Sequence, residues 1–239
     1  MNIATSLWVY LSGSPLLWLA VTLVAYSAAD RAAVASGRHP LANPVVIAVA
    51  LIGGVLLATR TPFETYFAGA QFVHFLLGPA TVALAVPLWR MRREVRRALL
   101  PMAAALLAGS LTGILSAIAC GWIAGAPAAI LASVAPKSVT AGIAMGISEP
   151  IGGLAALTAV VVVATGVFGA VIAGPLFDAM GIRDARARGF AAGLAAHGLG
   201  TARAFQIDRT MGTFAGIALG LNGLMTAVLV PLVWRWLVP

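Results

Sequence analysis

The sequence predicts an all-α polytopic membrane protein, and two observations support that fold class. Of the 239 residues, 61% are hydrophobic and only 9% are charged, whereas soluble domains carry about 25% charged residues. A surface with so few charges must face lipid, where only helices and closed barrels satisfy their backbone groups. The apolar runs are long and continuous, without the alternation over about 10 residues that is typical of barrel strands. They therefore predict helices.

A spanning helix needs about 20 apolar residues. The apolar segments are residues 14–34, 43–59, 64–90, 98–123, 126–149, 151–180, 189–205 and 211–238. Pro44 suits the first turn of the second segment. No Lys or Arg precedes Arg31, so the first segment lacks the basic start of a cleaved signal peptide. We expect it to remain as a transmembrane helix.

The arginines of two short loops predict the topology. Residues 90–97 hold five arginines in eight positions, and residues 181–188 are also Arg-rich. Such loops mark the cytoplasmic side, and they account for the net charge of +8 without a nucleic-acid partner. Segments 98–123 and 151–180 supply two crossings between the loops. Segment 126–149 is therefore expected to enter and leave by one side, as a re-entrant or broken helix.

Two segments of the chain show weak internal sequence similarity. Residues 77–82 and 134–139 place Pro, a hydroxyl residue and Val at matching offsets. Interrupted segments in corresponding positions are typical of inverted-repeat transporters, although matches this short also arise by chance. The prediction is one integral membrane domain over residues 1–239. Its repeat halves would be about 41–123 and 126–238, with scaffold and carrier (elevator-like) parts.

The first candidate site is the interruption that contains Lys137, Ser138 and Thr140, followed by Glu149. A charge at a helix centre costs about 2.5–3.5 kcal/mol, so Lys137 needs a partner or a role. Pro136 disfavours helix before it, and a helix restarting at Lys137 would present free N–H groups to an anion. The alternative is that Lys137 reaches the interface or pairs with Glu149.

The second candidate site follows residue 196. Gly200, with its neighbour Gly198, permits close approach or non-helical backbone, while His197, Thr201 and Arg203 supply donors. Arg203 suits a carboxylate, because its planar fork holds both oxygens, and His197 suits proton transfer near neutral pH. The alternative is a loop histidine and an arginine at the lipid headgroups.

Weaker candidates lie elsewhere. Pro79 and Thr81 belong to an interruption at residues 78–81 that would free backbone groups, and Asn222 is a lone amide inside the last segment. Asn222 could equally bond a neighbouring helix. The histidines are far apart and Cys120 is a lone cysteine, so we expect no metal site. Phosphate-loop and hydrolase motifs are absent, so we expect neither an enzyme nor a cofactor.

Four blocks of sequence together resemble the CidB/LrgB family of bacterial membrane proteins, which is related to the plastid glycolate/glycerate translocator. The blocks are LLGPATVALAVPLW (76–89), APKSVTAGIAMGISEPIGG (135–153), ARGFAAGLAAHGLGTARA (187–204) and LGLNGLMTAVLVPL (219–232). The resemblance spans roughly residues 40 to 235. The chain departs from the family pattern at Ala141-Gly142, Gly146, Pro150 and Ala196.

The resemblance implies a multi-pass protein of the bacterial inner membrane. It implies export or exchange of small monocarboxylates such as glycolate, glycerate, pyruvate or lactate. The substrate would contact Pro79, Thr81, Lys137, Ser138, Thr140, His197, Gly200, Thr201, Arg203 and Asn222, with His197 or Glu149 coupling a proton. The alternative is a holin- or antiholin-associated regulator of murein hydrolase export, autolysis and cell death, with a smaller holin-like partner. Because membrane transporters with a moving domain often dimerise through the fixed one, we expect a homodimer.

Overall fold

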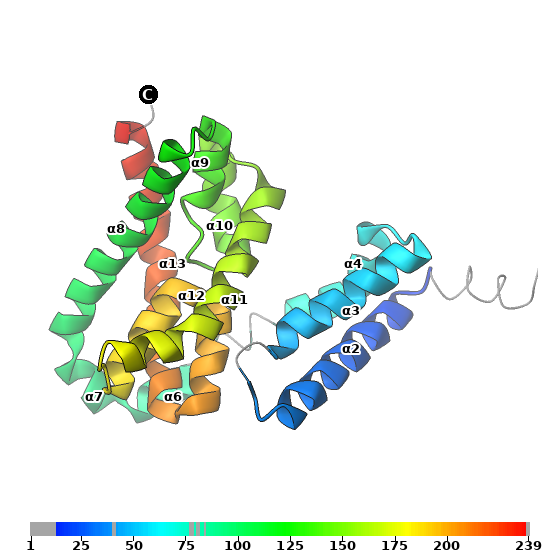
Figure 1. The fold of residues 1–239 in the computed structure, drawn as a ribbon, viewed down its shortest axis with the longest axis horizontal. Helices are drawn as coiled ribbons and strands as arrows, with labels where there is room; N and C mark the ends of the chain where they lie inside the picture. Colours follow the sequence, from blue (N-terminus) through cyan, green and yellow to red (C-terminus); the bar gives the residue numbers. More distant parts are fainter. Residues whose placement is uncertain (1–12, 40–41, 77–78, 80–81, 84, 238–239) are drawn as a thin grey trace, which may run out of the picture. The chain divides into compact units, whose positions relative to one another are not determined.

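The computed structural model describes residues 13–39, 42–76, 79, 82–83 and 85–237, and their regular structure is helical throughout (Figure 1). Four helices are long and apolar enough to cross a membrane: Pro15–Ala35, Leu99–Ile123, Ala155–Ala179 and Arg209–Leu237. These helices confirm the predicted all-α polytopic membrane class. The chain forms two compact units, Met1–Ala85 and Val86–Pro239. Whether it contains an inverted repeat stays a prediction.

The first unit contains α2 (Pro15–Ala35), α3 (Pro44–Thr59) and α4 (Phe63–Phe75). Pro44 occupies the first turn of α3, as predicted, and the Asn43 side chain accepts hydrogen bonds from Val45 and Val46 N–H. Such a cap satisfies donors that the helix cannot pair itself. Helix α2 packs against both other helices.

The contact between α2 and α4 is aromatic and hydrogen-bonded. Trp18 is fully buried, and its ring meets Tyr66 edge-on at a centroid distance of 6.0 Å. The Thr22 hydroxyl donates to Tyr66 Oη over 3.2 Å. A Cβ on Gly69 would collide with the backbone of Pro15, so glycine is required for α4 to lie this close to α2.

The second unit holds the remaining elements. They are α6 (Ala85–Arg90), α7 (Arg92–Arg97), α8 (Leu99–Ile123), α9 (Ala128–Val134), α10 (Ala141–Ser148), η1 (Glu149–Ile151), α11 (Ala155–Ala179), α12 (Ala185–Ile207) and α13 (Arg209–Leu237). Helices α8, α11 and α13 have 25, 25 and 29 residues. At about 1.5 Å per residue, each exceeds the 30 Å hydrocarbon core of a bilayer.

Helices α9 and α10, of 7 and 8 residues, form a helical hairpin, called here the first hairpin (residues 128–151). Its first arm begins beside the end of α8, where a Cβ on Gly121 would touch Leu131. The Ser133 hydroxyl, near the end of α9, accepts a hydrogen bond from Leu154 N–H over 2.8 Å, so the chain that leaves the hairpin passes beside its first arm. Neither arm is long enough to span.

The tip of the first hairpin differs in one detail from the sequence-based expectation. A helix was expected to restart at Lys137, but α10 begins at Ala141. The Lys137 N–H donates to Val134 O at 3.1 Å, and the Val139 N–H donates to Pro136 O at 3.3 Å. The expected free N–H at Lys137 is therefore wrong, because tight turns already use these donors.

Helix α12 is a second hairpin, in which residues 185–195 and 198–207 are the two arms. The backbone leaves the helical region at Ala196 (φ −119°, ψ 17°) and His197 (φ 41°, ψ −130°). A Cβ on Gly200 would collide with Ala192 O, whereas a straight helix would separate these residues by about 12 Å. The arms therefore fold back on each other. The non-helical backbone lies at Ala196 and His197, and Gly200 makes the close approach that was one of the two alternatives expected for it.

The second hairpin packs tightly on α13 through two glycines. A Cβ on Gly189 would collide with the carbonyl of Met211, and one on Gly193 with the carbonyl of Ala215. Small residues at helix interfaces allow backbones to approach closely, which is the main source of association between helices in lipid. More residue contacts join α12 and α13 than any other pair of described elements.

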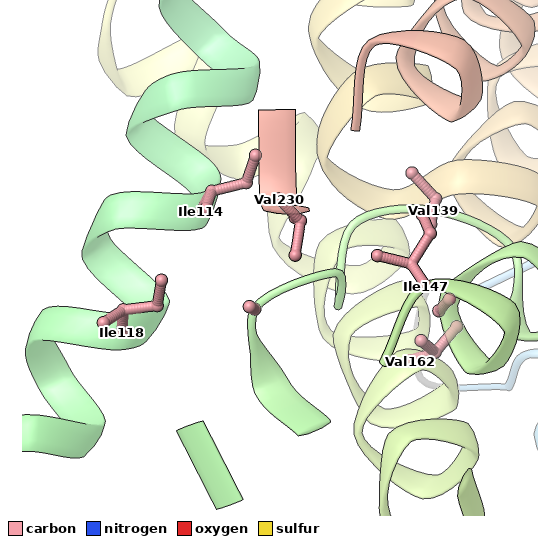
Figure 2. Close-up of a cluster of buried hydrophobic side chains, with 8 residues drawn as sticks. Ile114, Ile118, Val139, Ile147, Val162 and Val230 are labelled. Carbon is pink, nitrogen blue, oxygen red and sulfur yellow. The ribbon is translucent and has the colours of Figure 1, made fainter. Parts of the chain in front are cut away.

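A buried apolar cluster surrounds the first hairpin (Figure 2). It joins Ile114 and Ile118 of α8, Val139 at the tip, Ile147 of α10, Val162 of α11 and Val230 of α13. Figure 2 shows Ile114 beside Val230, and Val139 near Ile147. Because Val139 is fully buried among these long helices, its packing fixes the position of the hairpin tip relative to α8, α11 and α13.

Candidate functional site

A cavity of about 840 Å³ lies within the second unit. It is lined by Arg97, Ala98, Pro101, Met102, Ala105, Ala108, Gly109, Thr112, Gly113, Lys137, Ser138, Asp184, Arg186, Ala187, Phe190, Ala191, Leu194, Ala195 and Phe214. Its α8 residues recur every three or four positions, so one face of that helix forms a wall. The first arm of the second hairpin forms the opposite wall.

The cavity runs from the arginine-rich loops to the tip of the first hairpin. Arg97 and Arg186 line one end, and Lys137 and Ser138 line the other. Along α8 the lining extends from Pro101 to Gly113, which is about 18 Å at 1.5 Å per residue. Gly113 lies near the middle of α8. The cavity therefore reaches about half the length of a spanning helix.

Lys137 is half-buried at the base of this cavity. Its Nζ donates a hydrogen bond to the Ser138 hydroxyl over 3.3 Å. Within the described part of the chain, no acidic side chain forms an ion pair with it. Glu149 is exposed on η1, so the alternative in which it neutralises Lys137 finds no support. The ammonium group is available to an anion that enters the cavity.

Asn222 of α13 joins both hairpin tips. Its Nδ2 donates to Ser138 O at 3.2 Å and to Leu194 O at 2.9 Å, just before the bend of the second hairpin. Its Oδ1 accepts from Ser110 Oγ at 2.7 Å and from Thr226 Oγ1 at 3.2 Å. The donors and the acceptor of Asn222 are therefore satisfied. Asn222 does not line the cavity, but it holds the backbone of Ser138 and Leu194, which do.

His197 is buried against α11 rather than exposed to the cavity. Its Nε2 lies 2.9 Å from Val162 O, which fixes the proton on Nε2 when the ring is neutral. A Cβ on Gly166 would collide with this ring. The Thr201 hydroxyl donates to His197 O over 2.9 Å. These contacts hold the residue in an uncommon backbone region (φ 41°).

The other predicted site residues that the structure describes are absent from the lining of the cavity. Thr140 precedes α10, and its hydroxyl does not cap that helix. Gly200 is where the arms of the second hairpin meet, and the Arg203 guanidinium donates to Gln206 Oε1 at 3.3 Å. Pro79 is exposed in the first unit, while Thr81 lies outside the described residues. The structure thus places Lys137, Ser138 and Asn222 together, and places His197 and Arg203 elsewhere.

Sequence reasoning missed the residues that form the rest of the cavity. Thr112 lines its base beside Gly113, and Ser110 bonds to Asn222. Their signal is two hydroxyl residues, two positions apart and flanked by Gly109 and Gly113, inside the apolar run 98–123. Arg97 and Arg186 were taken only as topology signals. Nothing in the sequence indicated that both line one cavity.

The mouth of the cavity contains an ion pair. Asp184 caps α12 by accepting from Arg186 N–H at 2.8 Å, and its carboxylate also accepts from the Arg186 guanidinium at 2.6 and 3.1 Å. The side-chain hydrogen bond from Arg186, followed by its backbone hydrogen bond, lowers the pKa of Asp184 to about 2. Asp184 is therefore ionised at neutral pH, and Arg97 adds positive charge at the same end.

The long apolar helices, the two hairpins and the cavity define a polytopic helical membrane protein with a polar site inside the helical bundle. Residues 22–236 match the model of the LrgB-like family, and the chain belongs to this family. This finding confirms the resemblance that the four sequence blocks carry.

Named relatives illustrate the family. The chain is 34% identical to the uncharacterized protein YwbG of Bacillus subtilis, over 79% of this chain and 84% of the relative. It is 28% identical to the holin-like protein CidB of Staphylococcus epidermidis (81% and 85%). It is 27% identical to the antiholin-like protein LrgB of Bacillus cereus (92% and 95%). No solved structure matches the chain.

Proposed function

We propose that this protein is a secondary transporter that exports or exchanges small monocarboxylates, such as glycolate, glycerate, pyruvate or lactate, across the bacterial inner membrane. One observation supports this most strongly. The half-buried ammonium of Lys137, without an acidic partner among the described residues, lies at the base of a cavity that opens between arginine-rich loops.

Electrostatics favours an anion at this position. A Lys or Arg charge at the centre of a spanning segment costs about 2.5–3.5 kcal/mol, and a bound carboxylate offsets this cost by pairing with it. The Ser138 hydroxyl, already 3.3 Å from the Lys137 ammonium, is placed to bond a carboxylate oxygen or a neighbouring hydroxyl. Arg97 at the mouth attracts anions into the cavity, whereas the charge of Arg186 is balanced by Asp184.

The two hairpins suit alternating access. In this proposal each is a re-entrant element, the first from the outer side and the second from the cytoplasmic side, and their tips meet near the midplane at Asn222. Transporters commonly place the substrate where such broken helices meet, and move one bundle against another. The cavity described here is then the inward-open pathway. Homodimerisation through the fixed part remains part of the proposal.

Counterflow of labelled glycolate in proteoliposomes tests this function. The wild-type protein is compared with Lys137→Met, which keeps most of the side-chain length but lacks the charge, and with Arg203→Met as a matched control. Arg203 does not line the cavity. We expect Lys137→Met to lose at least tenfold in kcat/KM and Arg203→Met to change less than threefold. Unimpaired counterflow by Lys137→Met would defeat the proposal.

A second function is favoured by the names of the relatives, which are called holin-like and antiholin-like. In that case the protein regulates murein hydrolase export and autolysis, together with a smaller holin-like membrane protein. Expression would then change lysis or membrane leak without saturable uptake of any carboxylate. Lysis and counterflow measured on the wild-type protein and on Lys137→Met separate the two functions. The transporter shows saturable counterflow that is lost with the ammonium group, whereas the regulator changes lysis or leak and shows no saturable counterflow.

A further inference from the structure

The walls of the cavity differ chemically from its two ends. Between Arg97 at the mouth and Lys137 at the base, the lining is apolar on both sides. It consists of alanines, Pro101, Met102 and Gly109 on α8 and its start, with Phe190, Leu194 and Phe214 opposite. The hydroxyl groups that line the cavity, Thr112 and Ser138, both lie at the base. A ligand with several hydroxyls along its length would leave them unpaired, which costs free energy.

The cavity is also large for the smallest acids. Its volume of about 840 Å³ falls within the range of about 300–1,000 Å³ that is usual for sites of larger organic ligands. A two-carbon acid is about as large as three water molecules, each of which takes about 30 Å³ in the liquid. Such an acid would fill only a small part of the cavity beside Lys137.

We infer that the site takes monocarboxylates with an apolar aliphatic body in preference to short hydroxy acids; this inference rests on the proposed monocarboxylate function. The carboxylate pairs with the Lys137 ammonium and the Ser138 hydroxyl. The hydrocarbon chain lies along α8 towards Ala105 and Met102. Ala105 lies eight residues before Gly113, about 12 Å along the helix, so a straight chain of medium length reaches it.

Binding to a graded series tests the inference. Purified protein in lipid nanodiscs is titrated with acetate, butyrate, hexanoate, octanoate and glycolate, and with hexanamide as the uncharged control. We expect each added methylene to tighten binding by up to about fourfold, from the transfer of one buried CH₂ out of water. Hexanoate should bind at least tenfold more tightly than glycolate or hexanamide. In Lys137→Met, hexanoate and hexanamide should bind alike.

Two matched variants locate the aliphatic chain. Ala105→Leu adds bulk to the wall of the cavity, whereas Ala103→Leu adds the same bulk to an exposed position of α8 outside the lining. We expect Ala105→Leu to weaken octanoate at least tenfold and to leave acetate unchanged. Ala103→Leu should bind both acids as the wild-type protein does. Equal effects of the two variants would overturn the inference.

The possible failures are distinguishable. If no carboxylate binds, the proposed function fails together with the inference. If glycolate binds as tightly as hexanoate, the proposed function survives and the inference is wrong. If hexanamide binds as tightly as hexanoate, the cavity binds apolar chains without recognising the carboxylate, as a site for lipid tails would. That result also overturns the inference.

Discussion

Asn222 donates a hydrogen bond from its side-chain amide to the backbone carbonyl of Ser138 over 3.2 Å, which joins α13 to the tip of the first hairpin. The same amide donates to Leu194 O in the second hairpin. One side chain therefore connects the tips of both hairpins and fixes their relative position. Because Ser138 follows Lys137, the position of the ammonium group at the base of the cavity depends on this amide.

Replacing Asn222 by Leu should destabilise the second unit. Asn222 takes part in four side-chain hydrogen bonds, and hydrogen bonds between membrane helices average about 0.6 kcal/mol. We expect a loss of about 2 kcal/mol, measured by unfolding in mixed micelles. Thr226→Val removes only one of these bonds and should cost about a quarter as much. Equal losses would show that the amide does not join the tips.

The close packing of the second hairpin on α13 predicts a strong effect of one methyl group. Gly193→Ala places its Cβ against the carbonyl of Ala215, so the helices must separate and lose contacts. Gly220 of α13 is the matched control, because a Cβ added there would meet open space. Since alanine has the higher helix propensity, Gly220→Ala should be neutral or stabilising by up to about 1 kcal/mol. Thermal unfolding should show a lower unfolding temperature for Gly193→Ala and an unchanged or higher one for Gly220→Ala. A neutral Gly193→Ala would contradict the packing.

The backbone of His197 predicts an unusual order of stability. At φ 41° and ψ −130° a side chain is strained by about 1–3 kcal/mol, which glycine avoids. Both His197→Ala and His197→Gly lose the hydrogen bond to Val162 O, but only the alanine variant keeps the strain. We expect His197→Gly to unfold at the higher temperature. The reverse order would indicate a helical backbone at this residue.

The Asp184–Arg186 pair predicts a dependence of stability on pH. The guanidinium and backbone N–H of Arg186 hold the pKa of Asp184 at about 2, below the value of about 3.9 for an unperturbed Asp. The native state therefore gains stability above pH 4, and this gain is lost as the pH falls from about 4 to 2. The effect is small because the pair is half-exposed.

Asp184→Asn keeps an N-cap but removes the charge. The difference in unfolding temperature between wild-type protein and Asp184→Asn should be largest at neutral pH and should shrink towards pH 2. As a control, Asp30→Asn alters an exposed pair in the first unit and should leave the acid response of the second unit unchanged. A difference that is constant from pH 7 to pH 2 would contradict the depressed pKa.

Much of the fold was predictable from the sequence because its signals are local. Apolar length predicted the spanning helices. The arginine loops predict that residues 126–149 enter and leave by one side, which stays a prediction, although α9 and α10 are each too short to span. Pro136 lies at the tip that was predicted from it. The sequence indicates close approach or non-helical backbone at Gly198 and Gly200, and Gly200 does approach Ala192 closely, while the bend itself lies at His197. The sequence does not show that Val162 and Gly166 of α11 hold a histidine in that conformation.

The site was only partly predictable. Lys137 and Ser138 were found because a charge inside an apolar run is costly. The sequence left open whether Asn222 contacts substrate or bonds a neighbouring helix, because the partners of a lone amide depend on the tertiary fold. The cavity itself depends on packing between α8 and α12, which are far apart in the chain. This packing brings Arg97, Thr112 and Arg186 to the lining of the cavity, and no local sequence pattern predicts it.

The most direct test of the account is the accessibility of Thr112, which lines the base of the cavity. Cys120 is the single cysteine, so Cys120→Ser provides a cysteine-free background for Thr112→Cys. Leu115→Cys, an exposed position of α8 outside the lining, is the matched control. A membrane-impermeant thiol reagent should label Thr112→Cys in inside-out vesicles, and a carboxylate that the protein transports should protect it. Adding Lys137→Met should abolish that protection. Labelling that carboxylates leave unchanged, or protection that persists without the ammonium group, would contradict a substrate site at Lys137.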